Sequence, residues 1–244
     1  MSPTRIAWLS PSDPADAFPD VENALAEPDG LLAAGGDLSS ERLLQAYRRG
    51  IFPWYEEGQP ILWWSPDPRC VFLPGDLHVS RRLQQQMRNS AAELRFNHAF
   101  AEVIRACAGA RKSQQGTWIT DDMIAAYEAL HADGWAHSIE IWEAGELTGG
   151  VYGLLVGKAF FGESMFSATA NASKMALLGL AQYMQEFDLE LIDCQVVSEH
   201  LLSLGASVIS RSDFAAILKQ ACNPPNRHEI WPESPIPVSD LLRK

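Results

Sequence analysis

The chain has 244 residues, 47% of them hydrophobic, which is enough for one large domain or two smaller ones with an apolar core. No apolar run reaches the roughly 18–20 residues of a membrane helix, and the N-terminus lacks the basic start and apolar core of a signal peptide, so we expect a cytoplasmic protein without a membrane partner. The net charge of −12 argues against broad, nonspecific nucleic-acid binding, and the four scattered cysteines lack the spacing of metal ligands.

The first third of the chain mixes irregular and helical patterns. Residues 1–38 are rich in Pro, Asp and Gly and have the composition of an extended arm. The stretch DLSSERLLQAYRRG predicts a short helix that Ser39 caps and Gly50 ends. Two apolar runs, at 61–64 and 70–73, flank a Ser-Pro-Asp-Pro turn and predict a hairpin-like pair of strands. Capping residues and periodicity predict further helices at about 80–90, 98–108 and 121–133.

The pattern changes at His137. Strands are predicted at 137–143, 147–156 and 158–166, then a long helix from a capping Asn171, a strand at 189–197, a short helix, a strand near 206–210 and a helix near 212–221. This β-β-β-α-β-α-β-α order predicts a mixed α/β sheet. We place a boundary near residue 115, between a smaller N-terminal α+β domain (1–115) and a larger domain (116–244). The Pro-rich tail at 223–244 is left without a role.

Two apolar strands carry polar side chains that a core strand does not need. In LIDCQVV, Asp193 and Gln195 are two residues apart and are expected on one face, with Cys194 on the other. Glu163 lies in the equally apolar GESMF. A buried carboxylate must be paired or hydrogen-bonded. The three groups form either a structural polar network or the polar floor of an apolar pocket, and spacing alone favours neither.

Aromatic residues and charge are unevenly distributed. Trp54, Trp63 and Trp64 cluster in a Pro-rich stretch, and Trp118 precedes a helix. Such residues either pack rigidly, which is the commoner case and the expected one for Trp63 and Trp64, or stack on unpaired bases. Residues 76–115 have a net charge of +4 and residues 116–205 one of −11. This asymmetry reflects either solvated surface or a polyanion on one side and a cationic partner on the other.

Several common catalytic motifs are missing from the sequence. There is no phosphate-binding G-x-x-x-x-G-K-[ST], no G-x-G-x-x-G after a strand and no G-x-S-x-G elbow. A Cys194 nucleophile with His200 as its base is the remaining covalent alternative, although the sequence supplies no orienting group or oxyanion donor for it.

A set of long, rare motifs resembles one family along nearly the whole chain. The motifs EPDGLLAAGGDLS, AYRRGIFPWY, ILWWSPDPR, GTWIT, GGVYG, FFGESMFS, NASKMALL, LIDCQV and SLGA occur in order between about residues 22 and 215. Together they resemble the leucyl/phenylalanyl-tRNA–protein transferases, and only the tail beyond residue 222 matches weakly.

The resemblance implies a function and a fold. It implies transfer of Leu or Phe, and less well Met, from Leu-tRNA or Phe-tRNA to the α-amino group of proteins with N-terminal Arg or Lys, which marks them for N-degron degradation. It implies a GNAT-like C-terminal domain, consistent with the predicted strand order. It also implies a monomer that uses no cofactor, metal or ATP.

The resemblance assigns site residues position by position. Asp193 and Gln195 match the family's proposed catalytic pair, in which Gln195 either accepts a proton or only positions the amine. The residues matching the aminoacyl pocket are Val151, Glu163, Met165, Leu180, Met184 and Ile192. Family members carry aromatics at the positions of Leu180 and Met184, so this pocket could shift the preference between Leu and Phe.

The remaining assignments concern the tRNA and the acceptor protein. Trp54 and Trp118 match positions that hold the terminal adenosine, with Tyr47 and Tyr127 as weaker candidates for the same rim. The basic stretch supplies candidate phosphate contacts, namely Arg81, Arg82, Arg88, Arg111 and Lys112. The acidic stretch at 116–205 fits a cationic N-terminal Arg or Lys.

Two other functions fit the sequence less well. An acyl-CoA-dependent GNAT enzyme needs a Gly-rich pyrophosphate loop, where this chain has SATANAS. A non-catalytic reader of basic N-termini or RNA would not need Asp193, Gln195 and Glu163 within an unbroken set of motifs.

Overall fold

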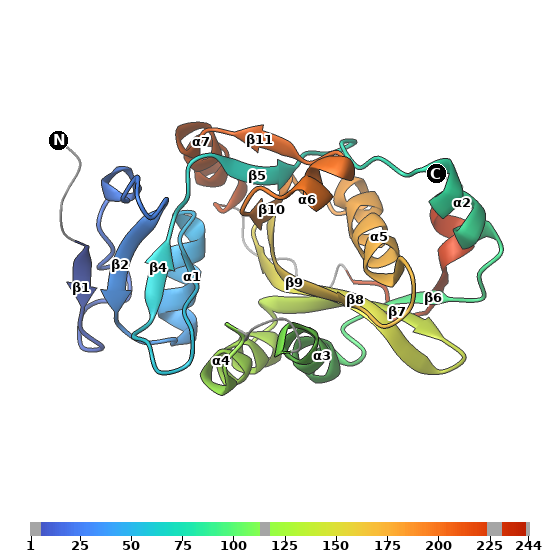
Figure 1. Cartoon of the computed structure of the whole chain (residues 1–244), viewed down its shortest axis with the longest axis horizontal. Helices are drawn as coiled ribbons and strands as arrows, with labels where there is room; N and C mark the ends of the chain where they lie inside the picture. Colours follow the sequence, from blue (N-terminus) through green and yellow to red (C-terminus); the bar gives the residue numbers. More distant parts are fainter. Residues whose placement is uncertain (1–5, 113–117, 224–230, 243–244) are drawn as a thin grey trace.

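The computed structural model of the chain describes residues 6–112, 118–223 and 231–242. A small four-stranded sheet lies at one end of the molecule, next to helix α1 (Figure 1). Its strand order is β1-β2-β4-β3, with bounds Ala7–Leu9, Leu31–Gly35, Leu62–Trp64 and Phe52–Pro53. β1 and β2 pair in parallel, and β4 pairs antiparallel with β2 and β3.

The expectation of an extended arm at 1–38 is wrong for the described part of that segment, which contributes two strands. Arg42 of α1 (Ser40–Arg48) explains this order, because its guanidinium is 1% exposed and donates to the backbone carbonyls of Asp13 and Pro14. It also pairs with Asp37 at 3.2 Å. One buried cation therefore ties the segment before β2 to α1.

The predicted start and end of α1 are confirmed. The Ser39 hydroxyl accepts from the Arg42 backbone N–H, as an N-cap should. Gly50 follows the helix with φ +73°, a conformation that glycine adopts without a Cβ penalty. A Cβ there would also lie 2.8 Å from the Phe214 ring.

An eight-stranded sheet forms the centre of the molecule, in the order β11-β5-β10-β9-β8-β7-β6-β12. The strands span Ser207–Ile209, Arg69–Phe72, Leu191–Gln195, Ala159–Ser167, Glu146–Val156, Ala136–Glu143, Glu93–Phe96 and Ile236–Pro237 in that order. β10 runs parallel to β9, and the other neighbours pair antiparallel. The predicted mixed α/β class is confirmed.

The hairpin predicted from the apolar runs at 61–64 and 70–73 is wrong. Both runs form strands, but β4 belongs to the small sheet and β5 to the large one. All four residues of β5 are buried, so this strand needs a partner on each side, and β10 and β11 provide them. β5 and β6 precede residue 115 and pair with strands that follow it; the domain boundary near 115 stays a prediction.

Helices cover both faces of the large sheet. In Figure 1, α3 (Phe100–Lys112) and α4 (Asp121–Ala132) lie below it and α5 (Ala172–Glu186) above it. The remaining helices are α2 (Arg81–Arg88), α6 (Glu199–Ser203) and α7 (Arg211–Ala221). Helices are thus confirmed at every predicted position. Among the residues that the structure describes, no helix is both long and apolar enough to span a bilayer.

The predicted cap of α5 has a different geometry. Asn171 occupies the N-cap position, but it has φ +68° and its side chain makes no capping hydrogen bond. Its amide donates to Gln86 of α2 at 2.8 Å instead. The side chain therefore joins two helices and does not close the end of its own.

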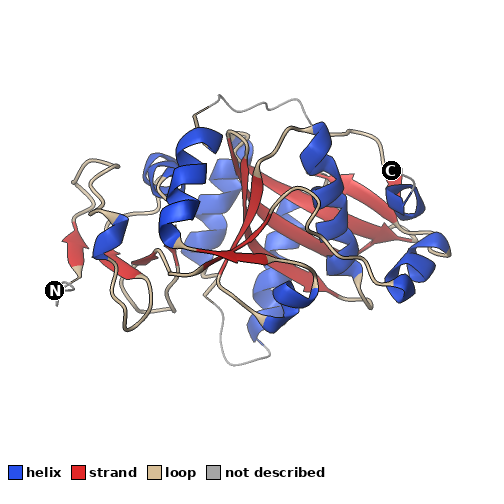
Figure 2. Ribbon diagram, turned by 90° about the horizontal axis from the view of Figure 1, so that it is seen from above, coloured by secondary structure: helices blue, strands red, loops and turns tan. Residues whose placement is uncertain are grey.

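The tail adds to the core at the far end of the sheet. β12 pairs with β6, and the following 3₁₀ helix (Val238–Leu242) buries Val238 and Leu241 in the cluster that also contains Leu83 and Met87 of α2. Figure 2, viewed from above, shows this end opposite the small sheet. The described part of the tail therefore covers a sheet edge.

The close packing of β8 against β9 gives a stability prediction. A Cβ on Gly153 would lie 2.1 Å from the Phe161 carbonyl oxygen and 2.7 Å from the Phe160 ring. Gly153→Ala should therefore reduce the free energy of unfolding by about 1–3 kcal/mol. Gly109 in α3 has no atom within 4 Å of its Cβ position, so Gly109→Ala should increase that free energy by about 0.5–1 kcal/mol. Urea unfolding followed by circular dichroism measures both, and a loss at Gly109 equal to that at Gly153 would contradict the prediction.

Candidate active site

Glu163 lies in the middle of β9 with its carboxyl buried among three donors. The Tyr47 hydroxyl donates to Oε1 at 2.6 Å, the Tyr127 hydroxyl to Oε2 at 3.0 Å, and the Gln195 amide to Oε1 at 2.9 Å. The two tyrosine hydroxyls also hydrogen-bond each other. Burial raises the pKa of Glu163 to about 7, and the nearby charge of Asp193 acts in the same direction, while the three hydrogen bonds oppose them.

Asp193 is held by a cation that the sequence prediction missed. Arg69, the first residue of β5, donates to its two carboxylate oxygens at 2.8 and 2.7 Å, and both side chains are at most 1% exposed. The guanidinium also donates to the Gly50 carbonyl and lies over the rings of Phe52 and Phe214, 4.9 and 4.5 Å from their centroids. The sequence did contain a signal for this ion pair, because Arg69 is a single charged residue at the start of an otherwise apolar strand.

Gln195 sits at an irregularity of β10. The pairing with β5 shifts register between Asp193 and Gln195, and Gln195 has φ +63°. Its backbone N–H donates to Asp193 Oδ1 at 2.9 Å, while its side chain turns to Glu163. The regular alternation expected for this strand is therefore wrong at its end: Asp193 faces Arg69, and Cys194, expected on the opposite face, lines the site.

A small apolar cavity of about 140 Å³ lies over β9 and β10. Its wall consists of Val151, Gly162, Glu163, Ser164, Met165, Leu177, Ile192, Cys194 and Leu201. Four of the six residues expected for an aminoacyl pocket are thus brought together. Leu180 and Met184 are not in this wall; both are at most 1% exposed and pack in the adjoining core. Leu177, one turn earlier on α5, and Leu201 of α6 line the cavity and were not expected from the sequence.

A second cavity of about 320 Å³ adjoins the first and shares Gly162, Glu163 and Cys194 with it. The indoles of Trp54 and Trp118 line it, together with Phe52, Pro53 and Gln195–Ser198. Trp54 is 43% exposed. Trp63 is fully buried, which confirms the prediction that it packs in the core. Tyr47 of α1 and Tyr127 of α4, expected at this rim, are both fully buried in the core, where their hydroxyls contact Glu163.

The covalent alternative with Cys194 loses its chemical basis. A hydrogen bond with Cys70, followed by burial, raises the pKa of the Cys194 thiol well above its ordinary value. Because the thiolate is the nucleophilic form, this cysteine is poorly suited to attack. His200, its expected base, lies on α6 with an exposed side chain.

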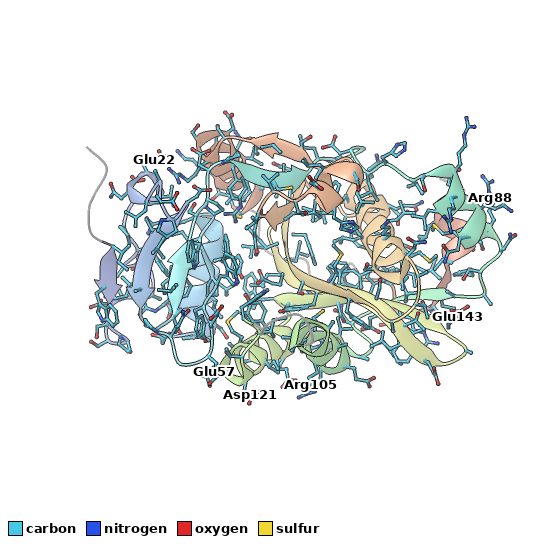
Figure 3. The ribbon with its side chains drawn as sticks, in the orientation of Figure 1. Glu22, Glu57, Arg88, Arg105, Asp121 and Glu143 are labelled. Atoms are coloured by element: carbon cyan, nitrogen blue, oxygen red, sulfur yellow. The ribbon has the colours of Figure 1, made fainter. Side chains whose placement is uncertain are left out.

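The basic residues expected to contact tRNA phosphates lie on two helices. Arg81, Arg82 and Arg88 are exposed on α2, and Figure 3 shows Arg88 at the end of the molecule away from the small sheet. The side chains of Arg111 and Lys112, at the end of α3, fall outside the described residues. All five assignments stay predictions. No group of three or more metal-ligating side chains occurs in the part of the chain that the structure describes.

Comparison with known families agrees with this arrangement. The family model described as leucyl/phenylalanyl-tRNA protein transferase matches residues 71–219, and the model of the N-terminal domain of that transferase matches residues 36–67. The chain belongs to this family. It is therefore a transferase. The two models meet between residues 67 and 71, where the chain passes from the small sheet to the large one.

Two curated relatives support the family assignment, and a more distant solved structure aligns over part of the chain. The chain is 52% identical over 234 residues to the leucyl/phenylalanyl-tRNA–protein transferase of Cellvibrio japonicus, covering 94% of this chain and 99% of the relative. It is 55% identical over 226 residues to that of Pseudomonas fluorescens, covering 93% and 99%. A ribosomal-protein-alanine N-acetyltransferase structure from Brucella melitensis aligns with 19% identity and a TM-score of 0.35, over 47% of this chain and 87% of the other.

The buried ion pair gives a second stability prediction. Arg69→Met leaves Asp193 buried without its cation, and Asp193→Leu leaves Arg69 without its anion, so each should reduce the free energy of unfolding by about 3–5 kcal/mol. The double variant should lose less than the sum of the two, because no unpaired charge remains. Lys158→Met, which breaks a partly exposed pair with Asp188, serves as the control and should change stability by about 1 kcal/mol or less. Urea unfolding of all four variants decides the point, and strictly additive losses would contradict it.

Proposed function

We propose that the protein transfers Leu or Phe, and less well Met, from aminoacyl-tRNA to the α-amino group of proteins that begin with Arg or Lys. The observation that carries this proposal is the pair of adjoining cavities, one small and apolar and the other walled by two indoles, which share Glu163 and Cys194. An aminoacyl-adenosine has the same two parts, an apolar side chain and a base, joined at the reactive ester.

The small cavity suits an amino-acid side chain that is not branched at Cβ. Its wall combines flexible Met165 with Leu177, Ile192 and Val151, so it can adapt to Leu, Phe or Met. A β-branched side chain fits such a pocket less well, because its bulk lies next to the backbone. Discrimination of this kind is worth about 1–3 kcal/mol per methylene.

The larger cavity suits the terminal adenosine of the tRNA. Trp54 and Trp118 present indole surfaces, and stacking of a base on an aromatic side chain contributes about 1–3 kcal/mol. The exposed arginines of α2 are then available to phosphates further along the acceptor stem.

The reaction needs positioning more than strong acid–base catalysis. The attacking amine nitrogen forms a bond to the ester carbonyl carbon, the bond to the ribose oxygen breaks, and the amine proton ends on that oxygen. The ester is already activated, so the transfer uses no ATP, and orientation of the two reactants alone can contribute about 7–11 kcal/mol. A free α-amino group has a pKa of about 7.7–8.0, so about a tenth of it is already unprotonated at pH 7 and the proton is easily lost.

Gln195 and Asp193 take different roles in this reaction. Gln195 lines the larger cavity and its amide nitrogen is committed to Glu163, so its carbonyl oxygen is the end that can accept a hydrogen bond from the amine. An amide is a poor proton acceptor, so we assign Gln195 to orienting the amine. Asp193 is a positioning residue, since it is paired with Arg69 and holds the Gln195 backbone.

The acceptor's cationic first residue fits the charge near the aromatic cavity. Burial raises the pKa of Tyr55, which follows Trp54 in the chain, and the neighbouring carboxylates of Asp122 and Glu57 raise it further. Figure 3 shows Glu57 and Asp121 projecting from the same corner of the molecule. An N-terminal Arg or Lys would meet negative charge there. We further propose that the enzyme acts as a monomer in the cytoplasm and that its products enter N-degron degradation.

A transfer assay tests this function and its base-binding residues. The enzyme is incubated with radiolabelled Leu-tRNA and a peptide beginning with Arg, without ATP or CoA, and label should reach the peptide. Trp54→Ala or Trp118→Ala should lower kcat/KM by about ten- to a hundredfold, the loss of one stacking contact. Trp8→Ala removes an indole that is 70% exposed on the small sheet and should leave the rate unchanged. Absence of label with the wild type would overturn the function, and undiminished transfer by Trp118→Ala would overturn the site.

Substitution of Leu177 tests the small cavity. Leu177→Phe adds bulk to a wall of a cavity of about 140 Å³, so transfer of Phe should fall more than transfer of Leu. The ratio of kcat/KM for Leu-tRNA over Phe-tRNA should rise by about tenfold. Leu202→Phe, at an exposed position of α6, is the matched control. An unchanged ratio in a folded Leu177→Phe enzyme would show that the cavity does not hold the aminoacyl side chain.

A further inference from the structure

The oxygens of Tyr47, Tyr127 and Glu163 make three contacts with one another. Tyr47 contacts Oε1, Tyr127 contacts Oε2, and the two hydroxyls contact each other. Each contact needs one proton to be a hydrogen bond. With an ionised Glu163, both phenol protons point to the carboxylate and none remains between the two tyrosine oxygens.

The tyrosines cannot resolve this shortage by ionising. Burial raises the pKa of each well above its ordinary value, and the Glu163 charge acts in the same direction, so both remain phenols. Two phenols supply two protons for three contacts. The third proton must come from the carboxyl group.

We propose that Glu163 carries this third proton in the active enzyme, so that Tyr47, Tyr127 and Glu163 form a closed ring of hydrogen bonds around a neutral carboxyl. Oε1 accepts from the Gln195 amide, so the proton lies on Oε2 and is donated to Tyr127, which reverses the direction that this bond has when the carboxylate is ionised. Tyr127 donates to Tyr47, and Tyr47 donates back to Oε1. Every polar atom of the ring then has a partner, as buried groups require.

The neutral carboxyl has a consequence for the reaction, which rests on the proposed function. Glu163 borders both cavities, so the ester lies beside it. Negative charge develops on the ester carbonyl oxygen in the transition state, and an ionised carboxylate in a buried site would oppose it. Protonated Glu163 removes that repulsion and still anchors the Gln195 amide. The two tyrosines and Glu163 are thus positioning residues.

Charged and titratable groups on neighbouring strands also act on Glu163. Asp193 of β10 adds negative charge, which Arg69 of β5 offsets. Tyr152 of β8 packs edge-on against Tyr127, with ring centroids 5.7 Å apart, and Cys194 of β10 borders the cavity as a neutral thiol. Because the pKa of Glu163 is raised to about 7, its neutral fraction, and with it the activity, should fall as pH rises through neutrality.

The decisive experiment compares the wild type with Glu163→Gln across pH 6–9. The amide copies the neutral carboxyl and cannot ionise. The ratio of the two enzymes' kcat/KM at each pH cancels the titration of the acceptor amine and of the tRNA ester. We expect this ratio to fall at least about tenfold as pH rises through about 7. Glu163→Ala cannot form the hydrogen-bond ring, so its kcat/KM at low pH should be at least about tenfold lower than that of Glu163→Gln.

The tyrosine variants separate this mechanism from simple loss of packing. Tyr47→Phe and Tyr127→Phe each break the ring and leave one phenol, which can donate its proton to the carboxylate, so the carboxyl no longer has to supply a proton and the alkaline fall should move to lower pH. Tyr152→Phe deletes a buried phenol of the same core outside the ring and should leave the profile in place. A flat wild-type ratio, or Glu163→Gln as inactive as Glu163→Ala at every pH, would overturn the proposal.

Infrared spectroscopy of the free enzyme tests the protonation of Glu163 without substrates, and so independently of the proposed function. At pH 6, a wild-type minus Glu163→Gln infrared difference spectrum should contain the carbonyl stretch of a protonated carboxyl, and this band should disappear above about pH 8. Absence of the band at pH 6 in folded protein would overturn the ring even if transfer occurs. Presence of the band without any transfer to the peptide would overturn the function and leave the ring standing.

Discussion

The buried ion pair between Arg69 and Asp193 is the interaction on which the rest of the site depends. Two charges removed from water are stable only when their geometry and remaining hydrogen bonds are well satisfied. Here the guanidinium meets both carboxylate oxygens, a third hydrogen bond reaches the Gly50 carbonyl, and the Phe52 and Phe214 rings cover it. The pair therefore joins β5, β10, β3, the end of α1 and α7 at one point.

Two carboxyl groups in the same core have different partners. Asp193 has a full cationic partner in Arg69 and also accepts a hydrogen bond from a backbone N–H. Glu163 has only phenol and amide donors, so desolvation is the largest influence on it and raises its pKa. A buried acid beside a cation ionises, whereas one beside neutral donors tends to keep its proton.

The two sheets meet where the chemistry is proposed. The small sheet contributes Phe52, Pro53 and the adjoining Trp54 to the larger cavity, and the large sheet contributes Glu163 and Gln195. α5 and α6 close the apolar cavity with Leu177 and Leu201. Because an activated ester needs orientation more than activation, a site assembled from rigid elements of both sheets suits aminoacyl transfer.

The sequence by itself determined the helices, the mixed α/β order and, through resemblance of its motifs, the family, because capping residues, periodicity and long motifs are local signals. It also singled out Glu163, Asp193 and Gln195 as polar groups on apolar strands. The tertiary structure decided which of them meet: Arg69 claims Asp193, a register shift turns Gln195 to Glu163, and Leu177 replaces Leu180 in the cavity wall. It also separated β4 from β5 and placed Tyr47 and Tyr127 in contact with the Glu163 carboxyl. These choices depend on partners as far as 124 residues apart in the chain, which no local pattern records.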